Sequence, residues 1–222
     1  MPTPLTVLSI DGGGIRGILP ALVLERLEER TGRPVSALFD VVAGTSTGAI
    51  IALALTLAGE GGRPRWRAGD LVELYERDGP LIFARSVAER VRRLGGVEDE
   101  KYPSDGLRRA LRAYLGKGRL RDALCEVLVP AYETERRTAF FFRRRDARDP
   151  ARSRDFPVAL VAEASSAAPT LFEAVRLETA EPPGWLSLVD GGLFANNPAM
   201  CALVEARKHH PEREVLMVSL GT

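Results

Sequence analysis

The chain has 222 residues, of which 45% are hydrophobic and 27% are charged, and its formal net charge is +1. These values suit a globular domain with a sizeable core and give no indication of a nucleic-acid partner. No apolar run is long enough to span a membrane, and Met1 is followed almost at once by the first predicted strand, so we expect one cytoplasmic domain without a signal peptide.

A glycine-rich turn joins the first predicted strand, residues 6–10, to a helix predicted over residues 17–29. Its three adjacent glycines, Gly12, Gly13 and Gly14, leave several N–H groups unobstructed by side chains, so an anionic oxygen can approach the backbone. The turn also fits G-x-G-x-x-G, the dinucleotide-binding fingerprint. That fingerprint requires an acidic residue at the end of the second strand, whereas the nearest acidic residues fall inside the predicted helix. We therefore favour an oxyanion hole over a nucleotide site.

The second predicted strand, residues 40–43, leads directly into a serine between two glycines and then into an apolar helix at residues 47–57. Gly44, Ser46 and Gly48 form the G-x-S-x-G pattern of a nucleophile elbow, which needs both glycines because strand and helix come into close contact at the turn. The turn projects the Ser46 hydroxyl outward and points the first N–H groups of the helix at the same place. The sequence therefore predicts that Ser46 attacks a carbonyl carbon.

The middle of the chain continues the pattern of strands and helices that a layered α/β fold requires. Further helices are predicted at residues 68–76, 81–94, 104–115 and 158–165. Further strands are predicted at residues 126–131, 138–142 and 173–177. Loops are predicted at residues 59–64 and 146–155 from their glycine, proline and charge content.

Two arginine-rich stretches in this middle part each leave two alternatives open. The predicted helix at residues 81–94 has an apolar face opposite several arginines, which suits either an anionic membrane surface or, as we favour, packing on the core. Residues 140–145 (FFFRRR) lead into a loop with three more arginines, which form either a basic patch or a solvated loop with local ion pairs.

A third motif follows the predicted strand at residues 187–189, where Asp190 precedes Gly191 and Gly192. An aspartate before glycine is commonly a turn residue that accepts hydrogen bonds from nearby N–H groups. Beside the other two motifs, however, Asp190 becomes a candidate for catalysis. A helix is predicted at residues 198–208, with Asn197 as its cap, and a strand at residues 214–219 follows.

With these motifs in this order, the chain resembles the patatin-like phospholipase family. The resemblance is carried by residues 11–17 (DGGGIRG, which ends at Gly17), 44–48 (GTSTG), 164–172, 190–192 (DGG), 196–198 (NNP) and 215–222. It covers essentially the whole chain, residues 1–222, as one patatin-like domain, and it implies a three-layer α/β/α fold around a central, mostly parallel sheet. Members usually continue past the last strand, so we expect that a C-terminal region is missing or absent here.

The resemblance implies a lipid acyl hydrolase with a Ser46–Asp190 dyad, no metal and no cofactor. The composition supports a dyad independently, because the chain has only two histidines, His209 and His210. They follow the predicted helix at residues 198–208, and three helical turns carry them away from Asp190, whereas a triad needs an imidazole in contact with the serine. Asp190 is therefore the natural base.

The predicted reaction is attack of Ser46 on an ester carbonyl while Asp190 accepts its proton. N–H groups of Gly12, Gly13 and Gly14 would hold the oxyanion, with Arg16 nearby or bracing the loop. We expect phospholipid or another acyl-ester lipid as substrate, met at a peripheral membrane surface, and no nucleic-acid substrate. The sequence does not define the oligomeric state.

Three alternatives to this lipid hydrolase stay open. The first is acyl transfer to an alcohol other than water. The second is a regulatory or activator-dependent patatin-like domain that has no activity alone. The third, and weakest, is a nucleotide-binding oxidoreductase that uses the first glycine turn.

Overall fold

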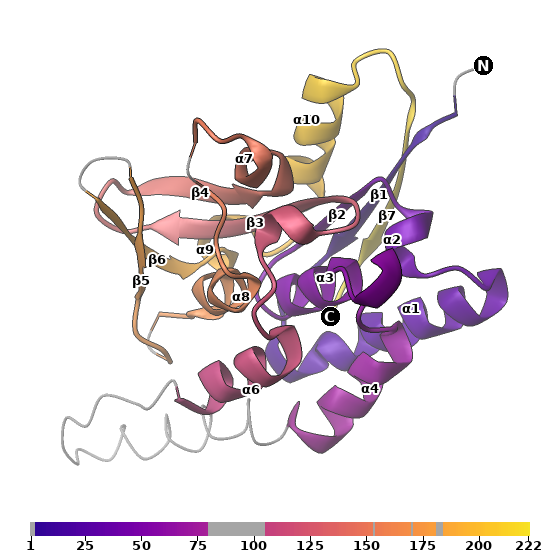
Figure 1. Cartoon of the computed structure of the whole chain (residues 1–222), viewed down its shortest axis with the longest axis horizontal. Coiled ribbons are helices and arrows are strands. Elements are labelled where there is room, and N and C mark those ends of the chain that lie inside the picture. Colours follow the sequence, from indigo (N-terminus) through magenta and orange to yellow (C-terminus); the bar gives the residue numbers. More distant parts are fainter. Residues whose placement is uncertain (1–2, 80–104, 153, 170, 181–183) are drawn as a thin grey trace.

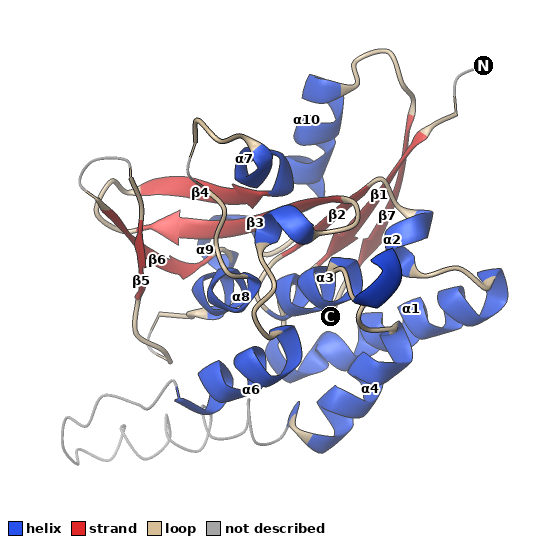
Figure 2. Ribbon diagram, in the orientation of Figure 1, coloured by secondary structure: helices blue, strands red, loops and turns tan. Residues whose placement is uncertain are grey.

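The computed structural model describes residues 3–79, 105–152, 154–169, 171–180 and 184–222, and within them seven strands form one sheet covered by helices (Figures 1 and 2). The strands are β1 (Leu5–Ile10), β2 (Val41–Gly44), β3 (Glu126–Glu133), β4 (Thr138–Arg143), β5 (Val175–Glu178), β6 (Trp185–Asp190) and β7 (Val215–Leu220). Their order is β5-β6-β3-β2-β1-β7, with β4 also paired to β3. All strands except β4 and β6 point the same way, so the sheet is mostly parallel.

Helices lie on both faces of the sheet (Figure 2). They are α1 (Ile18–Thr31), α2 (Val35–Leu38), α3 (Thr47–Thr56), α4 (Ala68–Arg77), α6 (Asp105–Leu115), α7 (Arg144–Arg148), α8 (Val158–Ser166), α9 (Gly192–Ala195) and α10 (Ala199–His209), with short 3₁₀ turns η1 (Gly14–Gly17), η2 (Glu60–Gly62) and η4 (Leu120–Asp122). The α10 helix packs on β1, β2 and β7, whereas α3 and α8 pack on the opposite face.

Side chains of β1 show why both faces need a cover. Leu5 and Val7 pack with Ala202 and Ala206 of α10, while Leu8 and the other inner side chains of the strand belong to the larger core around α3. Successive side chains of a strand point to opposite faces, so an almost wholly apolar strand is buried only between two helical layers. The predicted three-layer α/β/α arrangement is confirmed.

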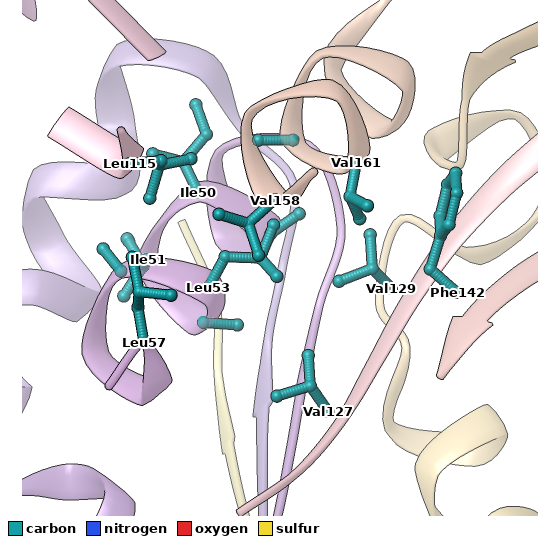
Figure 3. Packing of buried hydrophobic residues seen from close by; sticks show 14 of the residues in the cluster. Ile50, Ile51, Leu53, Leu57, Leu115, Val127, Val129, Phe142, Val158 and Val161 are labelled. Carbon is teal, nitrogen blue, oxygen red and sulfur yellow. The ribbon is translucent and has the colours of Figure 1, made fainter. Parts of the chain in front are cut away.

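The larger core is centred on α3, every residue of which is buried. Figure 3 shows Ile50, Ile51 and Leu53 of this helix among side chains of β3 and α8, including Val127 and Val158. A helix that is apolar on all sides is stable only inside the protein. Its first turn is therefore held rigidly, which matters because Ser46 immediately precedes it.

One pairing arrangement brings two strand ends together. Along one edge of β3, β2 pairs as far as Ala43 with Leu128, and β6 pairs from the other direction as far as Asp190 with Ala131. The opposite edge of β3 is occupied by β4. The carboxyl ends of β2 and β6 therefore face each other across a gap of two residues, and Pro130 lies in that gap.

All seven predicted strands and the described predicted helices are confirmed to within about two residues. The predicted helix at residues 81–94 lies outside the described residues. The loop predicted at residues 146–155 is wrong at its start, because α7 extends to Arg148, and the loop at residues 59–64 contains the η2 turn. Short α2 and α9 were not predicted.

The arginines after β4 are largely neutralised by local partners. Arg143 pairs with Asp146 and Glu205, and Arg152 pairs with Asp146 and Asp149. These contacts favour the ion-paired loop over an open basic patch. In the part of the chain that the structure describes, no helix is both long and apolar enough to cross a bilayer.

Candidate active site

The turn at Ser46 has the strained geometry of a nucleophile elbow. Ser46 lies at φ 54° and ψ −119°, a region that residues other than glycine rarely adopt. A Cβ at Gly44 would overlap the carbonyl of Gly48, and a Cβ at Gly48 would overlap the carbonyl of Ile10. Both glycines are therefore required by close backbone contact, as the spacing of the motif predicted.

Asp190 ends β6 and is almost completely buried beside Ser46. Burial raises the pKa of its carboxyl above the ordinary value, while hydrogen bonds from the Gly192 N–H and the Ser46 hydroxyl lower it. The Gly192 N–H lies 2.6 Å from Asp190 Oδ1, which fixes the orientation of the carboxylate. Gly191 completes the turn, because a Cβ there would overlap the Pro130 carbonyl. The structure thus brings the predicted serine and aspartate together.

The glycine turn after β1 is joined to the segment that follows Asp190. The Gly12 N–H donates to the Asn196 carbonyl at 2.9 Å, and the Asn196 side-chain amide donates back to the Gly12 carbonyl at 3.2 Å. The Thr222 hydroxyl also donates to the Gly12 carbonyl, at 2.8 Å. A Cβ at Gly12 would lie 3.3 Å from the Cβ of Ser46, so all three motifs meet at one place.

These contacts leave only part of the glycine turn available to an oxyanion. The Gly12 N–H is already donated to Asn196, whereas the N–H groups of Gly13 and Gly14 have no acceptor among the described residues. Arg16 is exposed, and its backbone N–H donates to the Gly13 carbonyl at 3.3 Å, so it braces the turn through its main chain. Gly13 and Gly14 are therefore the better candidates for the oxyanion hole.

Gly17, the last residue of the glycine turn, allows the start of α3 to approach. A Cβ at Gly17 would overlap the hydroxyls of Thr47 and Tyr75, which are hydrogen-bonded to each other. Burial raises the pKa of Tyr75, so its hydroxyl stays protonated at neutral pH. This contact packs the glycine turn directly against the serine elbow.

The end of α8 is hydrogen-bonded to both Ser46 and Asp190, and the sequence analysis did not predict these contacts. The buried Ser165 hydroxyl accepts the Ser46 N–H at 3.1 Å and donates to the Pro130 carbonyl at 2.7 Å. Two residues later, the Ala167 carbonyl accepts the Asp190 N–H at 3.0 Å. The only signal in the sequence is the run at residues 164–172, which carries the family resemblance but indicates no role for Ser165.

The two histidines lie far from this site, as predicted. His209 is the last residue of α10 and its Nε2 lies 3.0 Å from Glu205 Oε1. His210 lines a cavity at the opposite end of the sheet. The Asn197 side chain accepts the Ala199 N–H at 2.9 Å. The cap residue of α10 is Pro198 and not Asn197, so the predicted cap is wrong and the helix begins one residue later than predicted.

The family model for patatin-like phospholipases matches residues 8–203. The chain belongs to the patatin-like phospholipase family. It is 36% identical over 220 residues to Patatin-like protein 2 of Oryza sativa subsp. indica. The aligned region covers 92% of this chain and 53% of that protein. It is 32% identical over 242 residues to Patatin-T5 of Solanum tuberosum. Here the aligned region covers 98% of this chain and 60% of that protein. The chain thus spans about half the length of the rice protein.

Membership in the patatin-like phospholipase family supports lipid acyl hydrolysis at the level of the family, and the family predicted from the motifs is confirmed. The crystal structure of VipD from Legionella pneumophila matches 99% of this chain and 50% of its own, at 16% identity and a TM-score of 0.42. That similarity is too low to support an inference about function.

Proposed function

We propose that this chain is a serine lipid acyl hydrolase, a phospholipase A-type esterase in which Ser46 is the nucleophile and Asp190 the base. The observation that carries the proposal is the placement of the Ser46 side chain beside the buried Asp190 carboxylate, whose pKa it lowers. The raised pKa of Asp190 supports its role, because a carboxylate with a higher pKa is a stronger base toward a hydroxyl.

In the first half-reaction, Ser46 Oγ forms a bond to the ester carbonyl carbon as its proton passes to Asp190. The carbonyl electron pair moves to oxygen, and the alcohol then leaves with the proton from Asp190, so an acyl-enzyme remains. In the second half-reaction, water gives its proton to Asp190 and attacks the acyl carbon. The fatty acid leaves as Ser46 recovers a proton from Asp190.

The oxyanion of both tetrahedral intermediates would be held by the free N–H groups of Gly13 and Gly14. These groups begin a short 3₁₀ turn that leads into α1, so the partial positive charge of a helix start adds to their effect. Ser46 N–H is not available for this purpose, because Ser165 accepts it. The proposed oxyanion hole therefore uses the glycine turn and not the Ser46 N–H.

The surroundings of the site favour an apolar substrate. Ile15 and Leu19, just after the glycine turn, are 42% and 52% exposed. Leu193 and Phe194, just after Asp190, are 55% and 40% exposed. Large apolar side chains exposed on both sides of a polar dyad suit contact with acyl chains and with the surface of a lipid aggregate. We therefore propose a membrane lipid as substrate.

The proposal is tested with purified protein, a short-chain nitrophenyl ester and mixed phospholipid vesicles, with lipid products identified by mass spectrometry. Ser46→Ala and Asp190→Asn should each lower kcat at least about 10³-fold, because each removes a group that acts in the transition state. Ser36→Ala, a matched serine replacement at the other end of the sheet, should retain full activity. Retained hydrolysis in either dyad variant, with a normal thermal unfolding curve, would contradict the assignment.

A further inference from the structure

A cavity lies at the end of the sheet opposite the dyad. It has a volume of about 610 Å³ and is formed by the amino ends of β1, β2 and β3 with α7 and the last turn of α10. None of the residues of the dyad or of the glycine turn lines it. Its size is typical of pockets that bind small molecules, which measure roughly 300–1,000 Å³.

Four arginines from three separate segments of the chain line this cavity. They are Arg33 before α2, Arg144 and Arg145 at the start of α7, and Arg213 before β7. Three carboxylates also line it, so the arginines are in excess by one. The arginine side chains approach the same space from several walls, which is the arrangement that a polyatomic anion requires.

Most of these charges are already satisfied within the protein. Asp40 lies 3.4 Å from Arg213 and also accepts hydrogen bonds from Thr6. Glu205 lies 3.7 Å from Arg145 and is also paired with Arg143 and His209. Arg33 donates to the Ala37 carbonyl. These charged side chains therefore need no bound ligand to balance their charges.

Arg144 is different, because its Nε is fully buried and has no hydrogen-bond partner among the described residues. Burial and the neighbouring Arg148 lower the pKa of Arg144, since both disfavour its charged form. Glu126, the nearby carboxylate, accepts the Arg145 N–H at 3.0 Å and forms no salt bridge with Arg144. A buried guanidinium donor without an acceptor is costly, and such groups are rare in folded proteins.

We propose that this cavity binds a small soluble molecule carrying a phosphate group, with the Arg144 guanidinium as its main ligand and Arg33 and Arg213 on the adjacent walls. A phosphate offers three acceptor oxygens in a geometry that matches the fork of a guanidinium. None of the exposed large apolar side chains of the described residues lines the cavity, so it lacks the rim that an acyl chain would contact. A soluble phosphate ester therefore fits better than a lipid headgroup.

The experiment is calorimetric titration of the intact protein with inorganic phosphate and with glycerol 3-phosphate, in buffers matched for chloride. Arg144→Gln should weaken binding at least tenfold, because the guanidinium is lost. Glu126→Gln should tighten binding about threefold or more, because it removes a negative charge from the same wall while an amide oxygen remains for the Arg145 N–H. Arg112→Gln, an exposed arginine on α6 outside the cavity, is the matched control and should bind like the parent.

Equal binding by the parent and Arg144→Gln would overturn the proposal, as would a lack of binding to either phosphate compound. Vesicles of phosphatidylcholine with phosphatidic acid test whether the cavity binds the phosphate of a lipid headgroup instead. Arg144-dependent binding to these vesicles, without binding to the soluble compounds, would also overturn it. An increase in affinity on Glu126→Gln cannot result from misfolding, so the test holds even if Arg144→Gln is unstable. Inorganic phosphate and glycerol 3-phosphate contain no acyl ester, so their binding is independent of the proposed hydrolase activity.

Discussion

Asp190 combines two properties that oppose each other, since its carboxylate is the proposed catalytic base but is costly to bury. Its pKa is raised by burial, so the ionised form destabilises the folded state relative to the unfolded one. That cost is fully present above the folded-state pKa and disappears below the unfolded value of about 3.9. The same desolvation that strengthens the base therefore lowers the stability of the protein at neutral pH.

Asp190→Asn should consequently raise the midpoint of thermal unfolding at pH 7, because an amide at this position carries no charge and can still accept the Gly192 N–H. The advantage over the parent should shrink as the pH falls through the raised pKa toward about 4, where the parent carboxyl is also neutral. Calorimetric melting curves at several pH values measure this difference. A difference that stays constant with pH would contradict the assignment of the raised pKa.

Ser165 is expected to position Ser46 without touching the substrate. Ser165→Ala removes the acceptor of the Ser46 N–H and the donor to the Pro130 carbonyl, leaving two buried groups unpaired, at a cost of about 1–3 kcal/mol. We expect kcat to fall by about 10- to 100-fold with little change in KM, because the strained elbow loses its support. Steady-state kinetics and urea unfolding test both effects.

The neighbouring residue provides the control for that variant. Ser166 is also buried, but its hydroxyl has no partner among the described residues, so Ser166→Ala should be close to neutral or slightly stabilising. If both alanine variants lower kcat equally, the two hydrogen bonds of Ser165 do not position the elbow.

Among the structural elements, the crossing of α3 over the end of β1 depends on a glycine. A Cβ at Gly48 would overlap the Ile10 carbonyl, and backbone cannot move aside as a flexible side chain can. Gly48→Ala should therefore lower the free energy of unfolding by about 3 kcal/mol. Gly106→Ala, in α6 with open space around the new Cβ, should instead raise it by up to about 1 kcal/mol. Urea unfolding of the pair measures both changes, and similar stabilities would contradict the geometry of the elbow.

The elements that were predictable from sequence are those with a strong local pattern. Strands such as β1 and β2 are short apolar runs followed by glycine turns, and α4 has a clear apolar face, so each could be recognised from its own residues. The short helices α2, α7 and α9 have four or five residues, too few to show a helical period. The pairing of β6 with β3 was not predictable, because it joins residues more than fifty positions apart.

For the candidate site, the sequence identified the three turns but not the use of their hydrogen bonds. Glycines at the required spacing predicted that N–H groups would be exposed near Ser46. Which of them remains free depends on Asn196, whose carbonyl takes the Gly12 N–H from 184 residues away. The supporting role of Ser165 likewise depends on contacts with β3 that no local pattern encodes. The motifs therefore identified the candidate site residues, and long-range packing determined which of their hydrogen-bonding groups remain free.

At the scale of the whole molecule, the sheet ends in β5 and β7, and β7 is the end strand that exposes apolar side chains. Among the described residues β7 pairs with β1 alone, and its side chains Leu216 and Val218 are 59% and 38% exposed. An unpaired strand edge with apolar side chains is a template for association with another chain. The surface around β7 is therefore the part of this domain most prone to self-association.

Replacing Leu216 and Val218 together by lysine should reduce concentration-dependent association, with a change of only about 0.5 kcal/mol in stability, since both side chains face solvent. Sedimentation velocity over a range of concentrations measures the association. Val204→Lys, an equally exposed apolar position on α10, is the control and should have a smaller effect because it is not on a strand edge. Unchanged association in the double variant would show that β7 is not the contact.

Because β2 and β6 pair end to end along the same edge of β3, that strand sets the distance between the proposed nucleophile and the proposed base. The interval from Leu128 to Ala131 spans about 10 Å at the usual rise of a strand, whatever the length of the loops elsewhere. Loops facing the substrate can thus be lengthened, shortened or exchanged while this interval stays constant. One extra residue inserted between those two positions would separate Ser46 from Asp190 and should abolish the proposed activity while both side chains remain present.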